Sequence, residues 1–102
     1  TPVEDREIAI WMANRAEEIA ALLKALSHEG RLMILCHLAA GEKSVTELEG
    51  LLGQRQAAVS QQLARLRLEG LVSTRREGKA IFYALQDPRV MAFLRELPGT
   101  FG

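Results

Sequence analysis

The sequence predicts a single, mainly helical domain that carries a β-hairpin, in the order α-α-α-α-β-β-α. Three observations predict this fold class. Apolar residues recur at helical spacing through most of the chain, a glycine separates two short helical stretches between residues 44 and 70, and the period changes to that of strands after residue 70. Because 102 residues suffice for one core, we expect one domain over residues 1–102.

The first half of the chain predicts two helices. A long one is expected over about residues 6–26, with an apolar surface wider than one stripe. Such a surface is typical of a helix that packs against a second subunit, and packing of Trp11 on the monomer core is an equally compatible interpretation. After a break at Ser27 and His28, a second helix over residues 29–39 is apolar all round and should be central.

Residues 44–70 predict a helix-turn-helix. Ser44 and Glu47 have the spacing of a capping box at the start of a short helix. Gly53 ends that helix, because glycine adopts positive φ without steric cost. The second helix, from about Gln56 to Glu69, has a predicted buried stripe of Val59, Leu63 and Leu66. In such a motif the second helix can lie in a DNA major groove.

Two strands and a last helix complete the chain. Strands are expected over residues 71–76 and 80–85, joined by a tip at residues 77–79 in which Gly78 supplies the positive φ. We interpret residues 71–86 as a wing beside the second helix. Asp87 and Pro88 predict the start of a last helix over residues 88–97, which Pro98 and the glycine after it should end. The predicted fold is a winged helix-turn-helix with an extra helix at each end.

The charge distribution favours DNA as the partner. Net charge is zero, but residues 1–53 carry a net charge of −4 and residues 54–80 carry +4. The positive segment coincides with the second helix of the motif and the hairpin. Phosphate contacts need only a local basic face, so we expect binding to double-stranded DNA. A winged helix used only for protein contacts is the alternative.

Candidate DNA contacts follow from the helical geometry. The N-terminal half of a recognition helix reaches base edges, where glutamine can bond adenine and alanine can touch a thymine methyl group. The predicted base-reading residues are Gln56, Ala57, Ser60 and Gln61. The predicted contacts to the DNA backbone are Arg55, Arg65, Arg75, Arg76 and Lys79. One subunit reads few base pairs, so a two-fold dimer on a palindromic operator is expected.

The residues from about 16 to 97 resemble the ArsR/SmtB family of bacterial repressors. The matching segments are ALLKALSHEGRLMILCHL, VTELEGLLG and QAAVSQQLARLRLEGLVSTRREGKAIFYAL. The resemblance implies a homodimeric repressor that pairs through its first and last helices and leaves its operator when an inducer binds. The implied dimer interface comprises Ile8, Trp11, Met12, Phe93, Leu94 and Leu97. Gln62 departs from the family pattern, in which a histidine is frequent at that position.

One segment, RLMILCHLAAGEKSV, resembles the thiol-sensing branch of the family typified by BigR, SqrR and HlyU. There, a cysteine in the second helix works with another near the end of the last helix. Cys36 stands at the first position, whereas RELPGTFG contains no cysteine, so a bridge within the subunit is out of reach. The resemblance implies derepression by oxidants or reactive sulfur through Cys36. The alternatives are a repressor with a metal or no inducer, and a Cys36 that is an inert, packed side chain.

Other function classes find no support in the sequence. His28 and His37 are too far apart to pair on one helix face, so no metal site is expected. No nucleophile–base set or phosphate-binding loop has motif spacing, so we expect neither an enzyme nor a cofactor. The polar N-terminus, the single cysteine and the lack of a long apolar run predict a cytoplasmic protein without a membrane partner.

Overall fold

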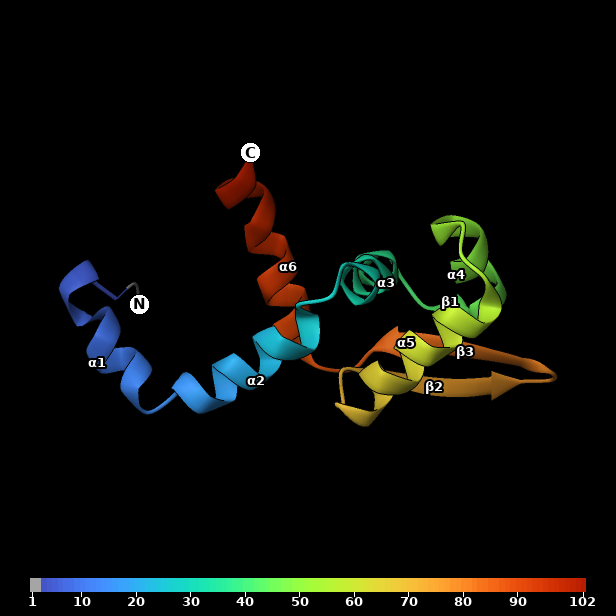
Figure 1. Ribbon diagram of the computed structural model, residues 1–102, viewed down its shortest axis with the longest axis horizontal. Helices are drawn as coiled ribbons and strands as arrows, with labels where there is room; N and C mark the ends of the chain where they lie inside the picture. Colours follow the sequence, from blue (N-terminus) through green and yellow to red (C-terminus); the bar gives the residue numbers. More distant parts are fainter. Residues whose placement is uncertain (1–2) are drawn as a thin grey trace.

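The computed structural model describes residues 3–102 and confirms the predicted winged helix-turn-helix (Figure 1). Its helical elements before the wing are the 3-10 turn η1 (Asp5–Glu7) and the helices α1 (Ile8–Ala13), α2 (Ala16–Leu26), α3 (Glu29–Ala39), α4 (Val45–Leu52) and α5 (Gln56–Leu68). The strands are β1 (Lys43–Ser44), β2 (Val72–Glu77) and β3 (Ala80–Leu85), and α6 (Pro88–Phe101) follows them.

One apolar core holds the domain together, with α3 at its centre. α3 contacts α2, α4, α5, α6 and β3, and its residues Ile34, Leu35 and Leu38 are buried. The predicted stripe of α5 is confirmed, because all three of its side chains are fully buried. The prediction that this helix is central is confirmed, although Met33 and Cys36 on its outer side are exposed. The other core residues are Ala25, Leu26, Leu48, Leu71, Val72 and Val90.

The N-terminal region is two helices, which corrects the prediction of one helix over residues 6–26. The break lies at Asn14 and Arg15, where the Arg15 side chain bonds the end of α1. The carbonyl of Trp11 would accept the backbone N–H of Arg15 in a continuous α-helix. Instead it accepts a hydrogen bond from the Arg15 guanidinium at 2.6 Å, and the Arg15 backbone N–H donates to Met12 at 2.8 Å. The guanidinium also lies 4.5 Å from the centre of the Trp11 ring.

Helix α1 stands apart from the core at the far end of the molecule from the wing (Figure 1). None of its residues is buried, and Ile10 is 76% exposed. Trp11 is exposed as well, so the interpretation that it packs on the monomer core is wrong. The chain measures 52 × 28 × 21 Å, and α1 and α2 extend along the long dimension.

The helix-turn-helix forms as its capping residues predict. The Ser44 hydroxyl accepts a hydrogen bond from the backbone N–H of Glu47, and the Glu47 carboxylate accepts one from the backbone N–H of Ser44. The reciprocal pair satisfies two of the N–H groups that a helix start leaves free. At the other end of α4, Gly53 has φ of 65°, which turns the chain toward α5.

The sheet has three antiparallel strands in the order β1-β3-β2. β1 was not predicted, because two residues are too few to show an alternating pattern. Its Lys43 and Ser44 pair with Tyr83 and Phe82 of β3. The hairpin tip is also one residue shorter than predicted. Glu77 pairs with Ala80, which leaves a two-residue turn that begins at Gly78 with φ of 61°.

Helix α6 begins as predicted but continues past its predicted end. The Asp87 side chain caps it by accepting from the backbone N–H of Arg89 at 2.9 Å. Pro98 does not end the helix. The Thr100 hydroxyl donates to the Glu96 carbonyl, and the Gly102 N–H donates to the Pro98 carbonyl at 3.1 Å, so the last turn closes around the proline.

Removing the Ser44 cap should destabilise the whole domain, because α4 packs Leu48 into the core. We expect Ser44→Ala to lower the free energy of unfolding by about 1 kcal/mol, the usual cost of losing an N-cap. Urea unfolding followed by circular dichroism measures it. Ser44→Asp keeps an acceptor at the same place and should retain most of the stability. Equal losses in the two variants would contradict the assignment of the cap.

Candidate nucleic-acid interface

One side of α5 is exposed to solvent. The buried stripe faces the core, so the residues on the opposite side of the helix are exposed. Three of the four predicted base-reading residues, Gln56, Ala57 and Gln61, lie on this exposed side, and Ser60 is half-buried beside them. All four belong to the N-terminal half of α5. Leu68, at the other end, is 84% exposed, and nothing in the structure explains it.

The start of α5 and the tip of the wing border the same cleft. Gln56 of α5 and Lys79 of the hairpin turn both line it, together with the first turn of α4. Its volume is about 290 Å³. Gln56 and Lys79 are 23 residues apart in the sequence, and the fold places these two predicted DNA contacts on the same cleft.

The two wing arginines lie on opposite faces of the hairpin. Arg75 pairs with Phe82 across the ladder and Arg76 pairs with Ile81. Because side chains alternate along a strand, Arg76 shares a face with Tyr83 and the buried Val72, whereas Arg75 shares a face with Phe82. The two residues are therefore not equivalent, although the sequence gives them the same predicted role.

Arg75 is held by two carboxylates. Its Nε lies 3.0 Å from both Glu42 oxygens, its Nη2 lies 2.5 Å from Glu42 Oε1, and its Nη1 lies 2.6 Å from Glu77 Oε2. The guanidinium carbon also lies 4.7 Å from the centre of the Phe82 ring. Glu42 belongs to the link between α3 and β1, so this cluster fastens the wing to the end of α3. Sequence analysis missed it, because the two partners are 33 residues apart and no local pattern joins them.

The cluster changes the acid–base properties of its members. The pKa of Glu42 is lowered, chiefly because Arg75 donates hydrogen bonds to its carboxylate. The pKa of Arg75 is raised, chiefly by its hydrogen bonds to Glu42 and then to Glu77. Both partners remain charged at neutral pH. A phosphate could reach Arg75 only by competing with these carboxylates.

The other residues predicted to contact the DNA backbone differ in whether they already form an ion pair within the protein. Arg55 is the N-cap residue of α5 and is exposed, and Arg65 forms an ion pair with Glu69 at 3.0 Å one helical turn away. Arg76 and Lys79 are exposed on the wing. Within residues 3–102, no ion pair involves Arg55, Arg76 or Lys79. These three cations are therefore available to an anionic partner.

Cys36 is exposed on α3, which argues against its interpretation as a packed side chain. It lies one helix upstream of the helix-turn-helix. The buried face of the same helix, formed by Ile34, Leu35 and Leu38, belongs to the core that also holds α5 and α6. A group added to the sulfur would meet solvent first.

The residues predicted for a dimer interface fall into two separate groups in this chain. Ile8 and Trp11 are exposed on α1, and Met12 is half-buried. Phe93, Leu94 and Leu97 are half-buried on α6. An apolar groove of about 360 Å³ runs between α2, α3 and α6 and is lined by Leu23, Leu26, Ser27, Leu32, Phe93, Leu97 and Phe101. Both α1 and this groove leave apolar surface uncovered.

The structure also bears on metal binding and on membrane insertion. In the part of the chain that the structure describes, no cluster of three or more histidine, cysteine or acidic side chains could hold a metal ion. None of the helices in residues 3–102 is both long and apolar enough to cross a membrane.

Comparison with known sequences gives a consistent set of relatives. The family described as "Bacterial regulatory protein, arsR family" matches residues 28–74. The chain is 50% identical over 101 residues to the biofilm growth-associated repressor of Agrobacterium fabrum, covering 98% of this chain and 86% of that protein. It is 44% identical over 86 residues to the transcriptional activator HlyU of Vibrio cholerae, covering 84% and 80% respectively.

Solved structures agree with the sequences. The fold is similar to the crystal structure of the transcriptional repressor BigR from Xylella fastidiosa, with a TM-score of 0.87, 45% identity and coverage of 97% of this chain and 98% of that one. It is also similar to the transcriptional regulator HlyU from Vibrio vulnificus, with a TM-score of 0.83, 41% identity and coverage of 89% and 95%.

The lowered pKa of Glu42 should depend on Arg75. Because the folded-state pKa is depressed, the ion pair stabilises the fold above the ordinary carboxyl range and is lost as pH falls through the lowered value. Carbon-13 NMR of the Glu42 carboxyl measures the titration directly. We expect Arg75→Ala to raise the Glu42 pKa toward its ordinary value, whereas Arg76→Ala leaves it unchanged. The same shift in both variants would mean that net charge, and not this contact, sets the pKa.

Proposed function

Because the chain belongs to the ArsR family of bacterial regulatory proteins, and is a transcriptional regulator rather than an enzyme, we propose that it represses transcription by binding a palindromic operator as a homodimer. One observation carries the proposal. Gln56 at the start of α5 and Lys79 at the wing tip border one cleft, and the exposed cations Arg55, Arg76 and Lys79 at the start of α5 and on the wing form no ion pair within residues 3–102. This arrangement suits a helix in the major groove with a wing on the adjacent backbone.

The proposed contacts divide by chemistry. Gln56 and Gln61 can each bond a base edge, Ala57 can meet a thymine methyl group, and Ser60 can bond either a base or a phosphate. Arg55, Arg76 and Lys79 are the proposed phosphate contacts. Arg65 would first leave Glu69, and Arg75 would first leave its two carboxylates, so both should contribute less.

Two surfaces support the proposed dimer. α1 buries none of its residues in the isolated chain, and the groove between α2, α3 and α6 is apolar and open. A second copy would cover such surfaces, which monomeric proteins rarely expose over a large area. A two-fold dimer would present two α5 helices to half-sites one helical turn apart, about 34 Å.

Salt titration of operator binding tests the proposal and separates the two wing arginines. With a DNA fragment from the protein's own promoter region, we expect Arg76→Ala to reduce the dependence of log K on log salt by roughly two, since each lost phosphate contact contributes about 0.9 and a dimer loses two. Arg75→Ala should reduce it by less. Fluorescence anisotropy at several salt concentrations measures both slopes.

Two controls sharpen this experiment. A fragment that carries one half-site should bind more weakly than the palindrome if the protein binds as a dimer. Gln61→Ala should relax base preference at one position and leave the salt slope unchanged. Absence of binding to the promoter fragment even at low salt would overturn the proposal and favour a protein-interaction module.

We propose Cys36 as the site that receives the inducing signal. Its exposure admits a reagent, and α3 packs against the helices that carry the proposed DNA and dimer surfaces. With hydrogen peroxide, the thiolate attacks one oxygen, the O–O bond breaks, hydroxide leaves and a sulfenic acid forms. With a polysulfide, the thiolate attacks a sulfane sulfur, the S–S bond breaks and the shortened polysulfide leaves as its thiolate.

Operator release after such treatment should require Cys36. We expect peroxide or polysulfide to release the parent protein from DNA, and intact-mass spectrometry to show one added oxygen or sulfur atom per chain. Cys36→Ser should bind DNA as the parent does and resist release. If Cys36→Ser were released equally, the cysteine would be inert, and a repressor with another inducer or none would be the better proposal.

A further inference from the structure

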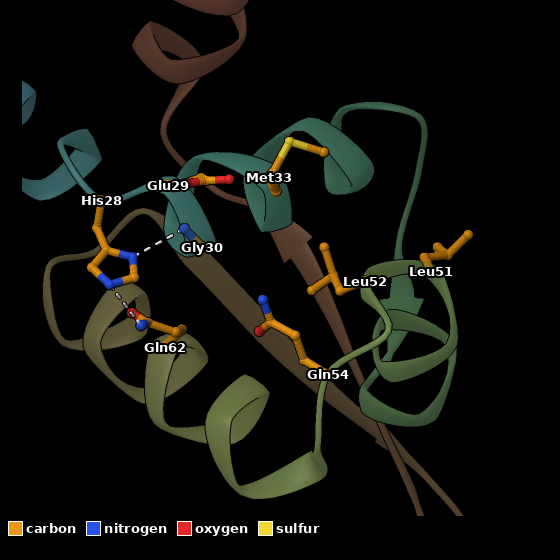
Figure 2. Close-up of a pocket in the computed structure, with 8 residues that line it drawn as sticks. All are labelled: His28, Glu29, Gly30, Met33, Leu51, Leu52, Gln54 and Gln62. Carbon is orange, nitrogen blue, oxygen red and sulfur yellow. Dashed lines mark hydrogen bonds between the residues drawn. The ribbon is translucent and has the colours of Figure 1, made fainter.

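The start of α3 is built around the imidazole of His28. His28 is the N-cap residue, and its Nδ1 accepts a hydrogen bond from the backbone N–H of Gly30 at 3.0 Å (Figure 2). A Cβ atom on residue 30 would lie only 3.1 Å from His28 Cε1 and 3.2 Å from Nδ1. The ring therefore occupies the space that a side chain at position 30 would need, and the glycine permits the cap.

The second nitrogen of the same ring points to α5. His28 Nε2 lies 3.4 Å from the amide nitrogen of Gln62, across 34 residues of sequence (Figure 2). A neutral imidazole has one N–H, and Nδ1 is occupied as an acceptor, so the proton belongs on Nε2. Nε2 is then a donor, and its partner must be the Gln62 amide oxygen. Rotating the amide by half a turn places that oxygen at the ring, since the two ends of an amide are nearly equivalent in shape.

This contact joins two elements that otherwise meet through apolar side chains. A pocket of about 410 Å³ separates the start of α3 from the end of α4 and the middle of α5, and His28 and Gln62 line it together with Met33, Leu51 and Leu52. Within residues 3–102, no other side-chain hydrogen bond links the α3 cap to α5. Hydrophobic contact is not directional, whereas a hydrogen bond has a preferred angle.

We infer that His28 is a positioning residue for the recognition helix. The buried stripe sets which side of α5 faces outward, and the contact through Gln62 adjusts the rotation of the helix within that limit, and so the direction in which the neighbouring Gln61 and Ser60 face the DNA. The inference rests on the proposed DNA binding for its functional consequence. His28 touches no base in this scheme, because its ring lies on the α3 side of α5. We therefore expect His28 to affect the affinity for the operator, whose base contacts depend on the orientation of α5, and not the affinity for non-specific DNA.

Two variants separate the bridge from the cap. His28→Asn keeps an N-cap acceptor for the Gly30 N–H, because asparagine is among the best N-caps, but its shorter side chain does not reach Gln62. Gln62→Met keeps the length of the side chain and the helix propensity and removes the acceptor. Each should weaken operator binding about fivefold for each subunit, the usual worth of one hydrogen bond, with non-specific affinity and salt slope unchanged.

The double variant and a matched control decide the outcome. If both single changes break the same contact, His28→Asn with Gln62→Met should bind as weakly as either alone. His37→Asn changes the only other histidine and should leave operator affinity unchanged. Losses that multiply in the double variant would overturn the inference, because they would mean that Gln62 acts on DNA independently of His28.

Nitrogen-15 NMR tests the bridge without DNA. In the parent at neutral pH, His28 should show an acceptor Nδ1 and a protonated Nε2, and Gln62→Met should move the Nε2 signal and leave Nδ1 unchanged. An Nε2 signal that does not respond to Gln62→Met would overturn the bridge even in a protein that binds its operator. If the parent bound no operator, the proposed function would fail, while this measurement would still decide whether His28 holds α5.

Discussion

The rest of the structure depends on the burial of one stripe of α5. A helix of 13 residues is marginal in water by itself, so α5 exists because Val59, Leu63 and Leu66 are enclosed by the core. The same burial determines which side chains are left outside. Truncating Leu63 or Leu66 to alanine would cost about 2–5 kcal/mol, a large part of what keeps a small domain folded. The proposed DNA-binding face and the stability of the domain therefore depend on the same three residues.

Two polar contacts add direction to this apolar packing, and both begin at an end of α3. His28 precedes α3 and contacts Gln62 on α5, and Glu42 follows α3 and holds Arg75 on the wing. The two elements of the proposed DNA surface are thus each tied to the same central helix. Cys36 lies on that helix between the two ties. A small displacement of α3 would therefore shift both α5 and the wing. These direct contacts could transmit a modification of Cys36 to the proposed DNA surface.

Sequence reasoning succeeded where the cause of a structure is local. The capping box at Ser44, the left-handed Gly53 and the alternation in the hairpin all act within a few residues, and all are present. The stripe of α5 was also predictable, because its spacing alone defines it.

The failures have longer-range or competing causes. At the break, the Trp11 carbonyl accepts from the Arg15 guanidinium and the Arg15 backbone N–H donates to Met12, and Pro98 is tolerated because later residues close the turn around it. For the candidate site, the sequence indicated the residues of α5 and the wing by type and position. It did not reveal that Arg75 is engaged by Glu42, nor that His28 reaches Gln62, because those pairs form only when segments 33 and 34 residues apart are folded together.

Helix α1 has a consequence for how long a single chain survives. It buries none of its residues and is joined to the rest through the irregular backbone at Asn14 and Arg15. Segments with so few buried contacts open easily and are where proteases cut. An isolated chain is thus the form most open to degradation, and any partner that covers α1 removes that weakness. If a second copy covers α1, as proposed, turnover in the cell would remove unpaired chains before paired ones.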